Sequence, residues 1–341
     1  MFRWVPNLKN WMESLNNPTP AKDVALGEAS FVNDEVPGSP NNSIRILWWV
    51  RFLPFFLSAL FFLSGLFAVF APLPILSSHL RNGRKWAWLA ALSNCIIVAL
   101  AGGQLSLIFY VVFIVALSLS LPELLKLKIS LEKSTVLTLL AMALSGALFV
   151  FGDALYHHLN PILEIKKQVS GFVDLLGQSI ASGSGVTGLL NAAEVDEWKR
   201  SLLVEFPSIV AVFSLVLVWA NLVLLLRANP NQMRESLGLD VSFLKKWKAP
   251  DYLVWPTIVT GFFLIFNAGV VSNVSLNVFK FLMAIYAIQG LSILTYFFDL
   301  WGIRGFFRII GFSIAVFLMT PVILSLGFFD LWFDFRSRFK Q

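Results

Sequence analysis

Long apolar runs alternate with short basic or polar connections along most of this chain. Seven of these runs approach the roughly 20 residues that cross about 30 Å of hydrocarbon at 1.5 Å per residue. They are Trp86–Gly102, Ser106–Leu125, Thr135–Tyr156, Phe206–Leu226, Leu253–Val271, Leu276–Phe298 and Phe306–Gly327. The pattern predicts an all-α fold, a polytopic transmembrane helical bundle.

A further apolar run, residues 46–80, is too long for one straight span and is interrupted by Gly65 and by the prolines at 72 and 74. Two short segments that turn near Gly65 fit it better than one long tilted helix. Counted as one span or as two, this run brings the total to eight or nine spans. Pro72 and Pro74 have two interpretations. They lie in irregular backbone at membrane depth, whose N–H and C=O groups need hydrogen bonds from protein or water, or they simply begin a helix.

Five regions follow from this pattern. Residues 1–45 are a polar, largely flexible N-terminal tail, residues 46–156 and 206–330 are two sets of transmembrane helices, residues 157–205 are an extracytoplasmic amphipathic loop, and residues 331–341 are a C-terminal tail. Within the loop, residues 161–180 have helical spacing, and a Gly/Ser stretch separates them from a second amphipathic piece at 192–203. This loop is either a lid over a site or an ordinary interfacial connection.

Basic residues are concentrated in alternate connections, so the positive-inside rule assigns those connections to the cytoplasm. Four connections carry them: Arg81/Arg84/Lys85, Lys126/Lys128/Lys133, Arg227/Arg234/Lys245/Lys246/Lys248 and Arg304/Arg308. Counting spans from these connections places the C-terminal tail outside, although it carries Arg336, Arg338 and Lys340. That placement conflicts with the rule.

The composition supports a membrane protein and narrows its chemistry. Hydrophobic residues make up 57% of the chain and charged residues 13%, against about 25% charged in soluble domains. The net charge of +6 is explained by the basic connections, so we do not expect a nucleic-acid partner. The single cysteine, Cys95, excludes an intrachain disulfide or a Cys-based metal site. No nucleophile elbow, phosphate loop or zinc motif is present, so no enzyme activity, cofactor or metal is predicted.

Polar residues within the apolar runs are the candidates for function, because at membrane depth they must bond within the protein or line a wet cavity. Asp153 and His157 are one helical turn apart and can face one ligand. Gln289, beside Gly290, is either a packing contact between helices or a ligand-facing group. Asn267 lies near the outer turn between residues 253 and 298. The predicted ligand-binding residues are therefore Gln289, Asn267, Asp153 and His157.

Several motifs resemble the YybS-like family of predicted bacterial membrane proteins, a domain of unknown function. They are Trp247 with Pro250, Trp255-Pro256, IQGLSILTYF at Ile288–Phe297, GFFDLWFDFR at Gly327–Arg336, and the early APLPILSSHLRNGRKWA. The resemblance covers about residues 46–336 and implies a multi-pass protein of the bacterial inner membrane. That family is distantly similar to the substrate-binding S components of energy-coupling-factor transporters. The paired small-xxx-small motifs expected of an S component are missing, and Ala143–Ala147 is a faint substitute.

Two functions remain open. One is a small-molecule binding or uptake component, with a ligand beneath the 157–205 loop. The other is a non-transporting membrane scaffold or assembly factor, whose partners are other membrane proteins. Both have the lipid bilayer as their surroundings. An outward-opening cavity lined by Gln289, Asn267 and Asp153 favours the first function, and a core sealed by Phe and Leu favours the second.

Overall fold

The computed structural model describes residues 52–338, apart from 159, 183–191, 240 and 267–268. All regular structure in this part of the chain is helical. Four stretches are long and apolar enough to cross a membrane: Arg84–Lys126, Leu131–Tyr156, Asp196–Ala228 and Val270–Leu300. The bent pair of α13 (Gly305–Leu318) and α14 (Thr320–Phe333) adds a fifth if it is counted as one span. The helical membrane fold is thus confirmed, and the count of eight or nine spans is not.

The run before residue 84 forms two short helices, α2 (Pro54–Leu63) and α3 (Pro72–Asn82), joined through a 3₁₀ turn at Ala68–Phe70. Gly65 has a positive φ of 68°, so the turn lies where it was predicted. Each helix is about 15 Å long, half the thickness of the hydrocarbon core. Pro72 occupies the first turn of α3, where its missing N–H costs nothing, so the helix-start interpretation holds.

Buried polar side chains donate hydrogen bonds to the irregular backbone between α2 and α3. Ser58 Oγ donates to the carbonyl of Ala71 at 2.6 Å, and Asn221 Nδ2 donates to the carbonyl of Val69 at 2.9 Å. These bonds meet the requirement that non-helical backbone in an apolar setting be paired within the protein.

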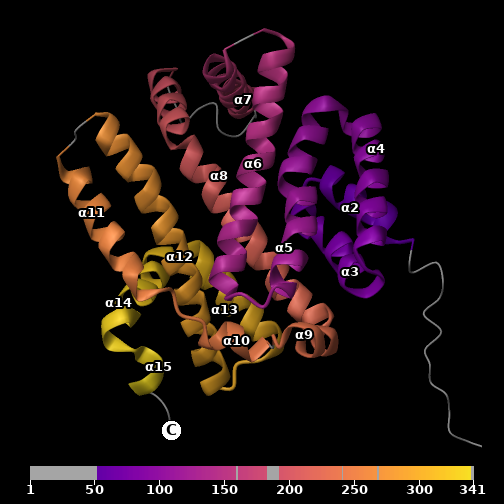
Figure 1. Cartoon of the computed structure of the whole chain (residues 1–341). Coiled ribbons are helices and arrows are strands. Elements are labelled where there is room, and N and C mark those ends of the chain that lie inside the picture. Colours follow the sequence, from indigo (N-terminus) through magenta and orange to yellow (C-terminus); the bar gives the residue numbers. More distant parts are fainter. Residues whose placement is uncertain (1–51, 159, 183–191, 240, 267–268, 339–341) are drawn as a thin grey trace, which may run out of the picture. The chain divides into compact units, whose positions relative to one another are not determined.

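Gly103 divides the next stretch into two arms. Its φ of 77° and ψ of −175° interrupt α4 (Arg84–Phe109), which continues through a π-helical turn, η3 (Tyr110–Val115), into α5 (Ala116–Lys126). Asn94 on the first arm bonds to α2 at Ala59, and Tyr110 on the second arm bonds to Ser58. Both arms reach neighbouring residues of α2 because the chain reverses, as Figure 1 shows. The arms correspond to the predicted spans Trp86–Gly102 and Ser106–Leu125.

Three helices follow: α6 (Leu131–Tyr156), α7 (Pro161–Ser182) and α8 (Ala192–Ala228). Ser130 caps α6 by accepting from the backbone N–H of Lys133. The predicted amphipathic helix is present as α7. The second amphipathic piece is not a separate helix, because it forms the first turns of α8. Lys199 in these turns forms an ion pair with Asp174 of α7 at 2.9 Å. The Gly/Ser joint of the lid hypothesis lies outside the described residues.

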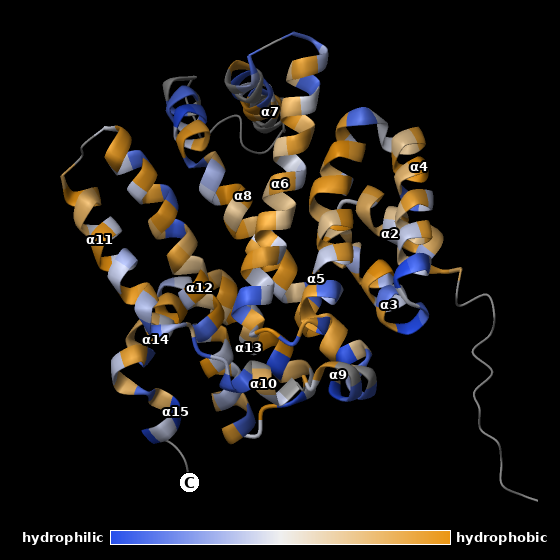
Figure 2. Cartoon of the chain, viewed as in Figure 1, coloured by the Kyte–Doolittle hydropathy of each residue, from blue (hydrophilic) through white to orange (hydrophobic). Residues whose placement is uncertain are grey.

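The four basic connections meet at one end of the helices. This end includes α9 (Pro230–Leu237), α10 (Val241–Lys246) and η4 (Asp251–Leu253), which leads into α11 (Val254–Ile265). Arg81 donates to Asn229, and Lys245 and Arg308 both pair with Asp299 at the end of α12 (Val270–Leu300). Figure 2 shows hydrophilic residues gathered around α9 and α10, below the apolar bodies of α6 and α8. Glu132, between Lys128 and Lys133, bonds to Trp247 at the same end, so the four basic connections lie together as their alternation predicted.

The C-terminal part differs from the prediction of one span at Phe306–Gly327. Helices α13 (Gly305–Leu318) and α14 (Thr320–Phe333) meet at 93°, and the short helix α15 (Phe335–Arg338) follows. Pro321 starts α14 because it cannot continue α13: it lacks the N–H that an ongoing helix needs. The chain therefore returns, and Arg336 donates to the backbone carbonyls of Lys245 and Trp247. These contacts place Arg336 at the end of the basic connections, whereas the sequence predicted a C-terminal tail on the opposite side.

Candidate functional site

A buried polar network joins α12 to the C-terminal helices. Gln289 and Asp330 are both completely buried, and Gln289 Nε2 donates to Asp330 Oδ2 at 2.9 Å. The other end of the amide, Oε1, accepts from the backbone N–H of Ala249 at 3.1 Å. Both ends of the Gln289 amide therefore form hydrogen bonds within the protein. This is the packing role that its position beside Gly290 allowed.

Arg336 neutralises the buried carboxylate. Its Nη2 lies 2.9 Å from Asp330 Oδ2, and Asp330 Oδ1 accepts from the backbone N–H of Phe335 at 2.9 Å. Because a buried carboxylate needs a cation and full hydrogen bonding, this arrangement explains how Asp330 is tolerated. The sequence signal for this buried pair is an acid within the apolar run GFFDLWF.

Two glycines bring α12 and α14 into backbone contact at the same place. A Cβ added to Gly290 would overlap the carbonyl oxygen of Ile323, and one added to Gly327 would overlap the carbonyl oxygen of Tyr286. Only glycine permits this approach, as in small-residue contacts between membrane helices. The region around Gln289 is thus a sealed helix crossing.

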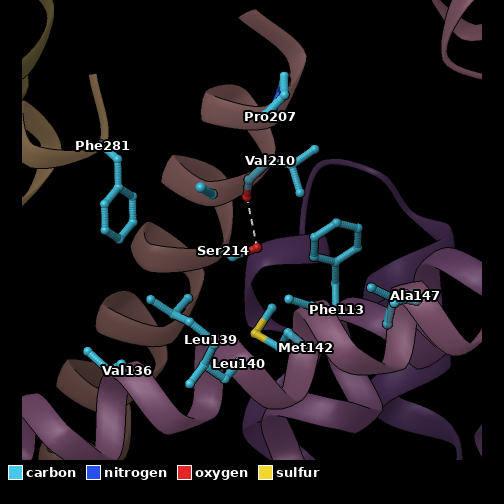
Figure 3. Close-up of a pocket in the computed structure, with 14 residues that line it drawn as sticks. Phe113, Val136, Leu139, Leu140, Met142, Ala147, Pro207, Val210, Ser214 and Phe281 are labelled. Carbon is cyan, nitrogen blue, oxygen red and sulfur yellow. Dashed lines mark hydrogen bonds between the residues drawn. The ribbon is translucent and has the colours of Figure 1, made fainter. Parts of the chain in front are cut away.

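An apolar cavity of about 490 Å³ lies between η3, α6, α8 and Phe281 of α12 (Figure 3). Its walls are hydrophobic except for Ser214, whose hydroxyl donates to the carbonyl of Val210. A second cavity of about 170 Å³ shares Val136, Leu139 and Phe281 with the first. We call the two together the α6 groove.

The α6 groove follows one face of α6 from Glu132 to Ala147, about 22 Å at the helical rise. Val136 and Leu140 on its wall are 54% and 58% exposed, so the groove is open to the surroundings of the protein along its side. In a membrane those surroundings are lipid chains. The groove has the apolar lining and the volume of a small-molecule site.

Polar groups gather at the basic end of the α6 groove. Glu132 accepts a hydrogen bond from Trp247 Nε1 at 3.1 Å, and the Trp247 ring lies 4.7 Å from that of Trp219. Thr135 also lines the groove here and is 7% exposed. This end combines an aromatic wall with a carboxylate and a hydroxyl, the few polar groups that orient a ligand in an apolar site.

Asp153 and His157 lie at the opposite end of α6. His157 Nε2 is 3.6 Å from Asp153 Oδ1, so the predicted pairing on one helical face is confirmed. Asp153 also lines a separate pocket of about 320 Å³ with Gln104 of α4 and Gln168 of α7. Part of the loop at 157–205 thus borders a pocket that includes one predicted residue. No group of three or more metal-ligating side chains occurs among the described residues.

The structure does not unite the four predicted site residues. Asp153 and His157 lie together, and Gln289 belongs to the Asp330 network and lines none of the three hollows described above. Asn267 lies outside the described residues. Sequence reasoning missed Glu132 and Thr135. The signal for them is weak, because a charged first turn of a helix usually reflects capping or solvation.

These features define an integral membrane protein built of apolar helices with one basic end. The family model described as "Predicted membrane protein (DUF2232)" matches residues 51–331, and the chain belongs to this family. No curated protein and no solved structure matches the chain. The comparisons support the predicted membrane family, and they provide no support for the YybS-like name or for a similarity to S components.

Proposed function

We propose that this protein is a multi-pass component of the bacterial inner membrane that binds a small amphipathic molecule in the α6 groove. The groove's volume of about 490 Å³, its apolar lining and its lateral opening carry this proposal. It keeps the first function expected from the sequence, small-molecule binding or uptake, and moves the site from Gln289 to α6.

The polarity of the groove supports an amphipathic ligand over a fully polar one. Apolar walls extend from Ala147 to Val136, and hydrogen-bonding groups occur at the Glu132 end. A vitamin-sized polar ligand would leave its polar groups unpaired along most of this length, which is costly in an apolar site. A ligand with an apolar body and one polar end avoids that cost.

A non-transporting scaffold is the second candidate, and α13 supports it. Phe306, Phe307, Phe317 and Leu318 are each at least 70% exposed on this helix. Such an apolar surface faces either lipid or another membrane protein. The groove itself could also receive a partner helix, because Ala143 and Ala147 on its wall are small.

Mass spectrometry of the small molecules and proteins that copurify in mild detergent tests the two functions together. We expect a small amphiphile that the wild type retains and that Ala143→Phe loses, because the phenyl ring would occupy the larger cavity. Retention of the same molecule by the variant would contradict the proposal. A stoichiometric membrane protein in place of the amphiphile would favour the scaffold.

A further inference from the structure

The polar end of the α6 groove carries a negative charge that the described part of the protein does not pair. Glu132 receives one hydrogen bond from Trp247 and forms no ion pair with a described residue. Other half-exposed acids at this end have cations: Glu123 has Lys126, and Asp299 has both Lys245 and Arg308. A half-buried carboxylate beside an apolar groove is best matched by a cationic ligand group.

A buried hydroxyl lies one turn along α6 from Glu132. Thr135 Oγ1 has no hydrogen-bond partner among the described residues, although its side chain is more than nine-tenths buried and lines the groove. Thr138, the next threonine of α6, instead donates to the carbonyl of Ser134. Thr135 Oγ1 is therefore an unpaired polar atom in the wall of the groove, where leaving it unpaired is costly.

The groove's length indicates the ligand's apolar part. From Glu132 to Ala147 it extends about 22 Å, more than half of the roughly 30 Å hydrocarbon core and less than all of it. A lipid chain spans one leaflet, about half of this core, so it fits within the length of the groove. The lateral opening at Val136 and Leu140 gives the chain a route from the membrane.

We infer that the ligand is a phospholipid with an ethanolamine head group. This inference rests on the proposed function of the groove. The ammonium donates to the Glu132 carboxylate and the Thr135 hydroxyl, and one chain lies along α6 toward Ala147. An ammonium has three N–H donors, whereas a choline has none and a glycerol head carries no positive charge.

Native mass spectrometry of the full chain tests this inference. The protein is released from bilayers that contain equal amounts of ethanolamine, choline and glycerol phospholipids with identical chains. We expect the wild type to retain the ethanolamine lipid preferentially. Glu132→Gln keeps an oxygen for Trp247 but removes the charge, and should lower this preference at least about fivefold, the loss of one charge-assisted hydrogen bond. Thr135→Val should lower it in the same direction.

Asp174→Asn is the control, since Asp174 is an exposed acid on α7 that lines none of the hollows described above. It should retain the wild-type preference. If Ala143→Phe releases the lipid but Glu132→Gln leaves the ethanolamine preference unchanged, the head-group inference is overturned and the proposed function stands. If Ala143→Phe retains the same lipid as the wild type, the groove is not the site and both fail.

Discussion

Gln289 on α12 and Asp330 on α14 are completely buried and hydrogen-bonded to each other at 2.9 Å, although 41 residues separate them in the chain. The pair fixes the C-terminal helices against the centre of the bundle. Because Arg336 closes the network from α15, the three residues connect α12, α14 and the basic end of the protein.

Gln289→Leu should destabilise the protein without removing its ligand. The substitution leaves the Ala249 N–H unpaired and takes one donor from Asp330, which costs about 1–3 kcal/mol per buried group. Thermal unfolding in detergent should show a lower midpoint, while the amphiphile retained by the folded protein should match the wild type. Loss of the ligand from a normally stable Gln289→Leu protein would instead restore Gln289 as a binding residue.

Arg336→Gln should be more harmful than Gln289→Leu, because it leaves the Asp330 charge buried without a cation. Breaking a buried ion pair from one side typically costs about 3–5 kcal/mol. The double variant Asp330→Asn, Arg336→Gln removes both charges and should recover part of the loss. Equal unfolding midpoints for the single and double variants would show that Asp330 and Arg336 are not coupled.

Gly290→Ala and Gly327→Ala should each separate α12 from α14, since the added methyl overlaps a carbonyl oxygen of the facing helix. Overpacking of this kind costs about 1–3 kcal/mol or more. Gly152→Ala on α6 is the matched control, because its methyl would meet no atom within 4 Å. It should be neutral or slightly stabilising through helix propensity. A Gly290→Ala protein as stable as the control would argue against the close crossing.

The side of the C-terminal segment can be measured by cysteine labelling. In a Cys95→Ser background, Ser337→Cys and Lys128→Cys should react with a membrane-impermeant maleimide from the same face, and Tyr156→Cys from the opposite face. The reason is that Arg336 contacts the Lys245–Trp247 backbone at the basic end. Labelling of Ser337→Cys together with Tyr156→Cys would restore a C-terminal tail on the outer side.

Local patterns in the sequence were sufficient for much of the fold. The apolar runs located the arms on either side of Gly103, the turn near Gly65, the long helices α6 and α12, and the amphipathic α7. Charge in the connections predicted their common end. These features depend on residues close together in the chain, where periodicity and turn chemistry are decisive.

The parts that sequence reasoning missed depend on contacts between distant residues. By hydropathy alone, residues 306–327 form one span. The bend before Pro321 becomes evident only from the hydrogen bond that Arg336 donates to the carbonyl of Trp247. Similarly, Glu132 resembles an ordinary first-turn acid until Trp247, 115 residues away, places it beside the groove. A buried role for Asp330 required knowing its partner.

Photocrosslinking from the groove wall tests the central claim most directly. A photoreactive amino acid replaces Leu140, which lines the α6 groove, or Leu100, which is 84% exposed on α4 and serves as the control. In native membranes we expect the Leu140 adducts to be dominated by one amphiphile, and the Leu100 adducts to follow the bulk lipid composition. Identical adducts at both positions, or a polypeptide adduct at Leu140, would contradict a ligand-binding groove.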